Sequence, residues 1–282
     1  MNELAIYIRN LLISYDDFKL WIENLELESG YIYGLIGKNG AGKTTLLKSI
    51  IDLITHTNDQ ILIYGKELKK HEIELKNKIG YVNDEFIYPL DMNPDKVAKN
   101  IGCFYEHFDR EYFDDLLEKF KISKFSKFKE MSKGDKNKFM IIFVLSYSPN
   151  LLILDEPTAN IDPVNRREIL DLLFDFMNEN RTILFSTHIT SDLDRIADDV
   201  LLLEQGNVVF NLPKDQMEEK YQKVYMDTVP QDIQPFLKGL VHTELGYEAL
   251  CTNAKKFEQD PRFTFKRANI EEIMYYWEIH HE

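Results

Sequence analysis

The sequence predicts an α/β protein whose core is a parallel β-sheet, and three observations lead to this fold class. Apolar runs of strand length recur at Tyr31–Ile36, Leu151–Leu154, Thr182–Phe185 and Val200–Leu203, as strands buried on both faces require. Segments of helical length, such as Arg166–Asn178, separate several of these runs. A glycine-rich turn follows the first run and opens another helical stretch. Because strands that alternate with helices form parallel sheets, we expect Tyr31–Ile36 near the centre of such a sheet.

Length and composition favour a globular protein with one large domain, or one domain with an appendage. The 282 residues and 33.3 kDa exceed the about 100 to 200 residues of a usual single domain. The chain is 44% hydrophobic and 29% charged, which excludes a mainly disordered or fibrous protein. Its net charge of −14 argues against nucleic acid as a partner. No apolar stretch approaches the roughly 20 residues that span a bilayer.

The N-terminal segment predicts an antiparallel β layer. Ala5–Ile8 and Phe18–Leu27 alternate or cluster apolar residues as short strands do, and a turn is expected at Asp16–Asp17. The start of the chain has neither the basic residues nor the apolar run of a signal peptide, so we expect a protein of the cytoplasm.

A P-loop follows the first buried strand and opens the helical stretch Leu46–Ile54. Its residues are Gly37, Lys38, Asn39, Gly40, Ala41, Gly42, Lys43, Thr44 and Thr45. Glycines let backbone N–H groups turn toward a phosphate, and the helix N-terminus adds a positive dipole end. We expect Lys43 to bind the β and γ phosphates and the Thr44 hydroxyl to coordinate Mg²⁺. A plain glycine-rich turn is the alternative interpretation.

Between about residues 93 and 148 the β character disappears, which predicts a helical insertion. Val97, Ile101, Phe104, Tyr105 and Phe108 fall at the spacing of one helix face. We therefore expect a helix over these residues within a helical subdomain.

Two carboxylates follow the second apolar run. Asp155 and Glu156 come directly after Leu151–Leu154, and ligands of parallel sheets bind at the carboxyl ends of strands. We expect Asp155 to hold Mg²⁺ through water and Glu156 to polarise the water that attacks the γ-phosphate. A solvated strand end would explain the pair equally well if no P-loop preceded it.

Past about Leu212 the sequence predicts a small α+β appendage. Tyr221–Tyr225 has the pattern of a strand. Ile270, Ile273, Met274 and Trp277 share one face of a predicted helix. Asn269 and Glu272 have the spacing of a capping box at its start, with Asn in place of Ser or Thr.

The cysteines indicate a reducing compartment. Cys103 and Cys251 are the only two, too few for a disulfide framework or a zinc cluster. We expect both to be buried free thiols.

Together these motifs resemble the nucleotide-binding subunit of an ABC transporter, over roughly residues 4 to 212. The resemblance implies a P-loop NTPase with a RecA-like core, an ATP-binding domain over 1–212 that includes a helical subdomain at about 93–148, and an accessory region over 213–282. Met131–Asp135 stands where the family has its Leu-Ser-Gly-Gly-Gln signature. Ser132 and Gly134 match, and the resemblance implies that they contact the γ-phosphate bound by a second subunit. Lys133 and Asp135 depart from the family pattern.

Two further motifs follow in the family's order. Ala159–Asp162 occupies the position of the D-loop, which in the family crosses the dimer interface, and Asp162 matches it. His188, after Phe185-Ser186-Thr187, is placed like the family's switch histidine, which contacts the γ-phosphate. Taken alone, a histidine after a strand is usually structural.

Upstream positions also carry the resemblance, with one departure. Asp84 stands where the family has the Q-loop glutamine, and Asn83 is the alternative by one register. A carboxylate at this position can orient Mg²⁺-bound water, but it adds negative charge beside the triphosphate. Tyr15 is placed like the aromatic residue that stacks on adenine; a structural tyrosine in a turn is the alternative.

The resemblance implies an ATPase that uses ATP and Mg²⁺, and we expect two such subunits, identical or paralogous, to sandwich two ATPs. A separate transmembrane permease would be the partner, which places the chain at the cytoplasmic face of the membrane. The signature, the acidic Q-loop position and the appendage are similar to those of bacterial exporters of antimicrobial or amphipathic peptides, including phenol-soluble-modulin exporters. The alternatives are an importer ATPase, a soluble ABC-type ATPase of translation or DNA repair, and a P-loop kinase.

Overall fold

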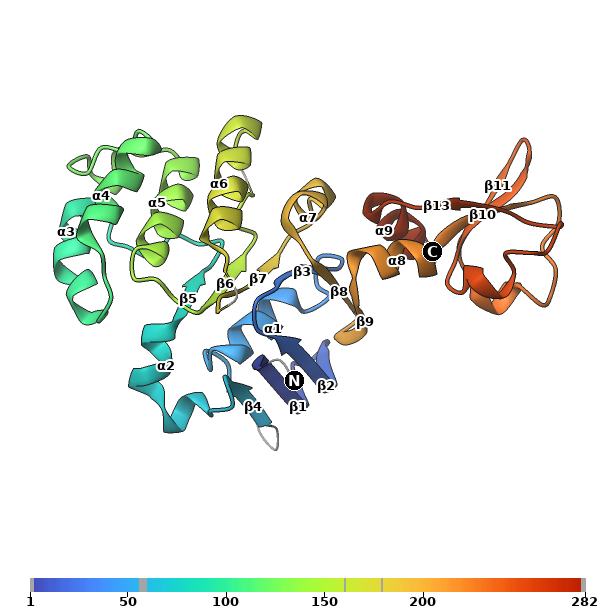
Figure 1. Ribbon diagram of the computed structural model, residues 1–282, viewed down its shortest axis with the longest axis horizontal. Helices are drawn as coiled ribbons and strands as arrows, with labels where there is room; N and C mark the ends of the chain where they lie inside the picture. Colours follow the sequence, from blue (N-terminus) through green and yellow to red (C-terminus); the bar gives the residue numbers. More distant parts are fainter. Residues whose placement is uncertain (1–2, 56–59, 160, 179, 280–282) are drawn as a thin grey trace.

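The computed structural model describes residues 3–55, 60–159, 161–178 and 180–279 as an elongated molecule (Figure 1). One end carries helices α3 to α6, and the other end carries a small second sheet. The main sheet lies between them with strand order β4-β1-β2-β9-β8-β3-β7-β6-β5. Within the described residues, no helix is long and apolar enough to cross a membrane.

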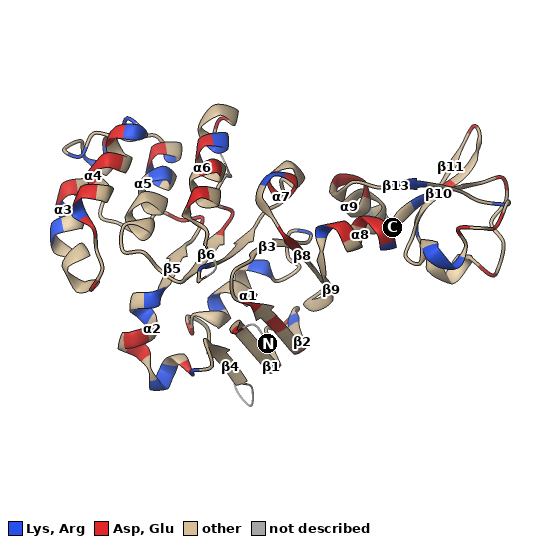
Figure 2. Cartoon of the chain, in the orientation of Figure 1, with Lys and Arg blue, Asp and Glu red and all other residues tan. Residues whose placement is uncertain are grey.

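The centre of the main sheet is parallel, as predicted. Its strands are β3 (Ile32–Ile36), β5 (Ile79–Val82), β6 (Leu151–Asp155), β7 (Thr182–Ser186) and β8 (Asp199–Glu204). Every residue of β3, β6 and β7 is buried, and Figure 2 shows these central strands largely free of charged residues. The α/β fold class predicted from the apolar runs is therefore confirmed, with β3 bonded to β7 on one side and to β8 on the other.

An antiparallel layer continues this sheet. Strands β1 (Leu4–Ser14) and β2 (Lys19–Glu28) form a hairpin, and β4 (Gln60–Ile63) pairs with the outer side of β1. Strand β9 (Asn207–Pro213) pairs antiparallel with β8 and meets β2 at one parallel bridge. The predicted antiparallel layer is confirmed, although β1 is longer than the expected strand Ala5–Ile8.

Helices cover both faces of the main sheet. On one face α1 (Lys43–Ile50) packs with the inner side of the β1–β2 hairpin, and α2 (Glu72–Lys78) lies beside it. On the other face lie α6 (Pro163–Phe176) and α7 (Thr190–Ile196). Helix α1 ends before the predicted Ile54. Helix α6 begins three residues before the expected Arg166.

The segment between β5 and β6 is helical, but the single helix predicted from the stripe at residues 97–108 is wrong. It contains α3 (Pro94–Asn100), α4 (Arg110–Lys119) and α5 (Lys133–Leu145). The chain leaves the helix after α3, turns through Gly102 and folds back so that the ring of Phe108 lies against that glycine, where a Cβ would be only 2.9 Å from the ring. Phe104 is consequently 79% exposed rather than buried.

The C-terminal residues form a four-stranded antiparallel sheet with the order β11-β12-β10-β13. Its strands are β10 (Gln222–Met226), β11 (Leu237–Thr243), β12 (Gly246–Cys251) and β13 (Thr264–Arg267). Only β10 was predicted from the sequence. Helix α8 (Lys214–Lys220) connects the main sheet to this second sheet. Short 3₁₀ helices lie at Leu68–Lys70, Gly102–Phe104, Phe128–Glu130, Gln234–Phe236 and Ala254–Lys256.

Helix α9 (Ile270–Ile279) joins the second sheet to the main core. The predicted capping box is confirmed, because the amide of Glu272 donates to Asn269 at 2.8 Å and the amide of Asn269 donates to Glu272 at 3.1 Å. Ile273 and Trp277 are buried in the large core cluster, and the indole Nε1 of Trp277 donates to Glu204 at the end of β8 over 3.0 Å.

The two cysteines differ from each other. Cys251 is a buried free thiol, as expected, but Cys103 is exposed. It lies in the surface turn that follows α3, so the expectation that both thiols are buried is wrong for Cys103.

Candidate functional site

The glycine-rich loop between β3 and α1 has a backbone that only glycine accommodates at two places. Gly37 has φ 151°, and a Cβ there would lie 2.2 Å from the carbonyl oxygen of Leu203. Gly42 has φ 104° as the residue before α1, and a Cβ there would lie 2.7 Å from the ring of Phe18. The loop is therefore clamped between the end of β8 and the β1–β2 hairpin.

The side chain of Lys43 extends across this loop, and its ammonium group contacts the loop backbone. Its Nζ donates to the carbonyl oxygen of Gly37 at 2.7 Å and to that of Lys38 at 3.4 Å, and the residue is only 8% exposed. The next residue, Thr44, is exposed at the start of α1. A buried positive charge at a helix N-terminus is the arrangement that binds a polyphosphate.

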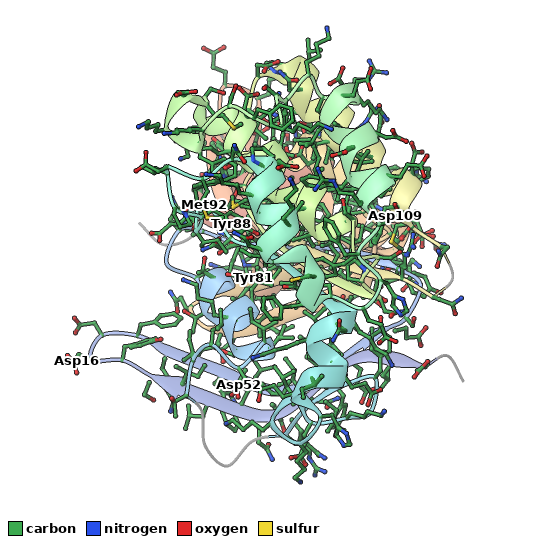
Figure 3. The ribbon with its side chains drawn as sticks, turned by 90° about the vertical axis from the view of Figure 1, so that its left-hand side faces the viewer. Asp16, Asp52, Tyr81, Tyr88, Met92 and Asp109 are labelled. Carbon is green, nitrogen blue, oxygen red and sulfur yellow. The ribbon has the colours of Figure 1, made fainter. Side chains whose placement is uncertain are left out.

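A groove of about 570 Å³ passes along this loop. Besides the loop residues Lys38 to Thr45, other than Ala41, it is lined by Tyr15, Asp17, Phe18, Asp84, Asp155 and Glu156. Tyr15 is 52% exposed and stacks on Phe18 with 6.5 Å between ring centroids. Both belong to the turn of the β1–β2 hairpin, whose tip at Asp16 projects from the body of the molecule (Figure 3). The groove therefore runs from a phosphate-binding loop to an exposed aromatic ring.

Asp155 is a buried carboxylate with one oxygen satisfied and one not. It is 1% exposed at the end of β6, and the register pairs it with Ser186 of β7. The Ser186 hydroxyl donates to its Oδ1 at 2.5 Å. Its Oδ2 is buried without a hydrogen-bond partner among the described residues. Such an atom in a folded protein calls for a ligand or ion.

The oxygen donors at this place fit Mg²⁺. Asp155, Thr44 and Asp84 all line the same groove, and Oδ2 of Asp155 has no hydrogen-bond partner among the described residues. Within the described ranges, no group of three His, Cys, Asp or Glu side chains is close enough to hold a metal by itself. Magnesium usually takes one or two carboxylates and completes its shell with water and phosphate oxygens, so this sparse set suits it.

Glu156 and His188 form a pair beside Asp155. Glu156 has φ 50°, and its amide donates to the Ser186 hydroxyl at 3.0 Å, which fixes its backbone at the end of β6. Its Oε2 lies 2.7 Å from Nδ1 of His188, which is 60% exposed after β7. A carboxylate oriented by an imidazole at the edge of the groove is able to accept a proton from water.

A second hollow of about 670 Å³ continues from the pair across the surface. It is lined by Ile36, Gly37, Lys38, Asn39, Asp84, Lys133, Glu156, Ala159, Thr187, His188, Thr190 and Met274. Lys133 comes from the first turn of α5 and Met274 from α9. The hollow therefore extends from the helical segment to the C-terminal helix.

The predicted site residues fall into two groups. The loop residues, Tyr15, Asp84, Asp155, Glu156 and His188 converge on the groove or the hollow, with Ala41 bordering a smaller hollow behind the loop. Ser132, Gly134 and Asp162 are not among the residues that line these hollows. Of the D-loop segment, Asn160 lies outside the described residues.

Ser132 and Asp162 begin helices. The Ser132 hydroxyl accepts from the amide of Asp135 at 3.1 Å at the start of α5. Asp162 accepts from the amides of Val164 and Asn165 at the start of α6. Hydrogen bonds from Asn165 to this carboxylate lower the pKa of Asp162.

Three contributors were missed from the sequence. Ser186 holds both Asp155 and the backbone of Glu156. Phe18 supports Tyr15 and packs against the loop. Tyr81 of β5 has a buried hydroxyl, and burial together with the charges of Asp155 and Asp84 raises its pKa well above the usual range. A serine and a tyrosine in strands and a phenylalanine in a hairpin turn carry no local signal, because their roles depend on which elements are neighbours.

Comparison with known proteins points to one family. A family described as ABC transporter matches residues 22–159, which contain the glycine-rich loop, Asp155 and Glu156. The ABC transporter ATP-binding protein YtrB of Bacillus subtilis is 32% identical over 72% of this chain and 70% of its own length. The bacitracin transport ATP-binding protein BcrA of Bacillus licheniformis is 32% identical, over 71% and 66%. The lantibiotic transport ATP-binding protein SrtF of Streptococcus pyogenes is 30% identical, over 69% and 84%.

Solved structures give the same result. A structure titled as the ATP binding subunit of an ABC transporter superposes with a TM-score of 0.69 at 25% identity, covering 76% of this chain and 92% of its own. The protein cbiO1 from Clostridium perfringens, part of the ABC transporter complex cbiONQ, has a TM-score of 0.62 at 26% identity, covering 78% and 92%.

Proposed function

The chain belongs to the family of ABC transporter ATP-binding subunits, which hydrolyse ATP, and from this premise we propose how its own residues bind and cleave the nucleotide. The observation that carries the proposal is the pairing of Glu156 with His188 beside the half-satisfied Asp155, next to the glycine-rich loop. In this arrangement Glu156 accepts the proton of the attacking water, and His188 orients Glu156 and contacts the γ-phosphate.

The loop binds the triphosphate. The amides of Gly37 to Thr45 surround the phosphates, while Lys43 exchanges its contacts to the Gly37 and Lys38 carbonyls for contacts to the β and γ phosphates. The adenine stacks on Tyr15 at the other end of the groove. Bound Mg²⁺ neutralises phosphate charge, and Thr44, Asp155 and Asp84 are the residues that would hold it.

A second ATP-binding subunit completes the site. Ser132 and Gly134 lie in the exposed start of α5, a 13-residue helix whose N-terminus favours an anion. Because neither residue lines the groove of its own chain, we propose that they contact the γ-phosphate of a partner, with Asp162 at the same interface. The partner is an identical chain or a paralogue.

The transport role is proposed from the relatives. BcrA is named for bacitracin transport and SrtF for lantibiotic transport. Both names refer to peptides, so we propose that this chain powers export of peptides or drugs through a separate transmembrane permease. It would then lie at the cytoplasmic face of the membrane, bound to that permease.

The test is co-expression of the chain with the membrane protein encoded beside its gene, in a host sensitive to bacitracin and lantibiotics. We expect the two proteins to co-purify in detergent and the host to become more resistant, with resistance lost in the Glu156→Gln variant. Failure to recover any membrane protein with an active ATPase would contradict the transport role. Substrate accumulation in place of resistance would indicate import.

A further inference from the structure

Three buried side-chain polar atoms of the main sheet have no hydrogen-bond partner among the described residues, and two of them lie on neighbouring strands. These two are the hydroxyl of Tyr81 on β5 and Oδ2 of Asp155 on β6. The parallel register pairs Tyr81 with Ile153, two residues before Asp155. Side chains two residues apart share one face of a strand, so Tyr81 and Asp155 are diagonal neighbours on the same face.

That face is the one that α1 covers. Tyr81 and Ile153 belong to the same apolar cluster as Leu46, Leu47 and Ile50 of α1. In the view of Figure 3, Tyr81 is labelled between the part that contains α1 and the helices α3 to α5 above it. The Tyr81 hydroxyl therefore lies in the same layer as the phosphate-binding loop.

Two tyrosines elsewhere in the core, one on the main sheet and one in the turn after β4, have hydroxyls with a hydrogen-bond partner. The hydroxyl of Tyr33 on β3 accepts from the amide of Glu28 at 2.8 Å. The hydroxyl of Tyr64 donates to the carbonyl oxygen of Asn150 at 2.9 Å. A phenylalanine at position 81 would pack in the same place without burying an unpaired donor, which destabilises a fold. We therefore expect the Tyr81 hydroxyl to have a hydrogen-bond partner in another state of the protein.

We propose that Tyr81 is a positioning residue of the magnesium–ATP site, whose hydroxyl donates a hydrogen bond to the oxygen shell around Asp155 when nucleotide and metal are bound. The inference rests on the proposed nucleotide site and extends it to a residue behind the groove. In the bound state, a single water of the metal's shell would accept from the Tyr81 hydroxyl and donate to Asp155 Oδ2, which would satisfy both atoms. By fixing that oxygen, Tyr81 orients the carboxylate of Asp155 toward the metal, as outer partners of metal ligands do.

The test compares the wild-type chain with Tyr81→Phe by thermal unfolding without ligand, with ATP in EDTA and with ATP in Mg²⁺. A magnesium titration of ATP binding accompanies it. We expect the melting temperature of unliganded Tyr81→Phe to equal or exceed that of the wild type. Stabilisation by ATP in EDTA should be unchanged, whereas the Mg²⁺ concentration for half-maximal binding should rise about tenfold. Mn²⁺ binding in the presence of ATP, followed by electron paramagnetic resonance, should weaken in parallel.

Tyr64→Phe is the matched control, because it removes a hydroxyl that has a partner in the unliganded fold. It should lower the melting temperature and leave the magnesium requirement unchanged. An unchanged magnesium requirement in Tyr81→Phe overturns the assignment of Tyr81. If wild-type protein itself gains no stability from ATP and Mg²⁺, the nucleotide site proposed above is at fault instead.

Discussion

At the scale of single residues, the ammonium group of Lys43 places a positive charge at the glycine-rich loop. Lys43 Nζ is held within the loop by two carbonyl oxygens. In the proposed complex it exchanges these contacts for contacts to the phosphates, and because its side chain is already ordered, binding adds little further ordering cost. The neighbouring Lys48, in the last turn of the same helix, is not part of the groove.

Lys43→Ala should sharply weaken ATP binding, because a charge-assisted contact to the phosphates is lost. We expect at least a tenfold rise in Kd, measured by equilibrium binding of a fluorescent ATP analogue. Lys48→Ala is the matched control on α1 and should leave Kd near that of the wild type. Unchanged affinity in Lys43→Ala, with a normal circular dichroism spectrum, would contradict the assignment of the loop.

Asp84→Gln should keep ATP binding and hold or raise basal turnover. The carboxylate of Asp84 borders both hollows of the site, and its removal relieves negative charge beside the triphosphate. Steady-state phosphate release measures the effect, with Glu85→Gln as the neighbouring exposed control. A loss of turnover beyond about a hundredfold would show instead that the carboxylate is itself catalytic.

Site residues could be predicted from the sequence where they belong to a short motif of neighbouring residues. Lys43, Thr44, Asp155 and Glu156 follow strands and glycines at fixed intervals, so the groove itself could be located from the sequence. Tyr81 and its neighbours were not predictable, since their partners are set by strand order across the sheet. The roles of Ser132, Gly134 and Asp162 remain predictions.

At the scale of elements, α9 shows how the C-terminal region is joined to the rest of the chain. Its buried face belongs to the same core cluster as β6, β7 and α6. The ring of Trp277 also makes edge-to-face contacts with Phe210 of β9 and with Tyr221. The C-terminal sheet is therefore packed against the main core through this helix and not attached by a linker alone.

Trp277→Ala should lower the free energy of unfolding by about 3 kcal/mol, as for other large buried side chains. Trp277 is 7% exposed, and its loss also leaves Glu204 without the indole donor. Urea unfolding followed by circular dichroism measures the change. The exposed neighbour Tyr275 provides the control, since Tyr275→Ala should change stability by no more than about 0.5 kcal/mol. Equal effects of the two variants would contradict the packing of α9.

Helix α9 also illustrates why some elements were predicted and others missed. Its apolar face and capping box are local signals, and both are confirmed. The helix expected over Val97–Phe108 had an apolar stripe too, but the chain folds back so that the ring of Phe108 packs against Gly102, which a stripe alone does not reveal. Strands β11, β12 and β13 were missed because each is partly exposed, so the alternation of buried and exposed apolar positions is weak.

At the scale of the whole molecule, buried tyrosines make stability sensitive to alkaline pH. Burial raises the pKa of Tyr221 and of Tyr64 to about 12 in the folded chain, against an ordinary value of 10.0. The folded state therefore keeps a proton that the unfolded state loses first. This contribution is fully present below pH 10 and is lost as the pH rises from about 10 to about 12.

Tyr221→Phe removes one of these groups and should make stability fall less steeply over that window. Urea unfolding at intervals from pH 8 to pH 12 measures how the free energy of unfolding changes with pH. The values for the variant and for the wild type are each compared with that protein's own value at pH 8. An identical slope in the variant would contradict the shifted pKa of Tyr221.

The arrangement of the whole chain agrees with the fold class expected from its sequence. The parallel centre and the antiparallel layer follow from apolar runs and one hairpin signal. Their assembly into one nine-stranded sheet required contacts such as Trp21 with Asn207, which are far apart in sequence. The proposed closure of two such molecules over ATP depends also on the surface that the second subunit contributes.

Glu156→Gln tests the central claim most directly, because it keeps the shape of the proposed base and removes the charge that accepts the proton. General-base loss costs about 10² to 10⁴ in rate, whereas ground-state contacts to ATP should barely change. The variant, alone or with its permease, should therefore accumulate as a dimer in ATP and Mg²⁺ but not in ADP, measured by size-exclusion chromatography with light scattering. Full ATPase activity in the variant, or an inactive variant that stays monomeric in ATP even with its permease, would contradict the account.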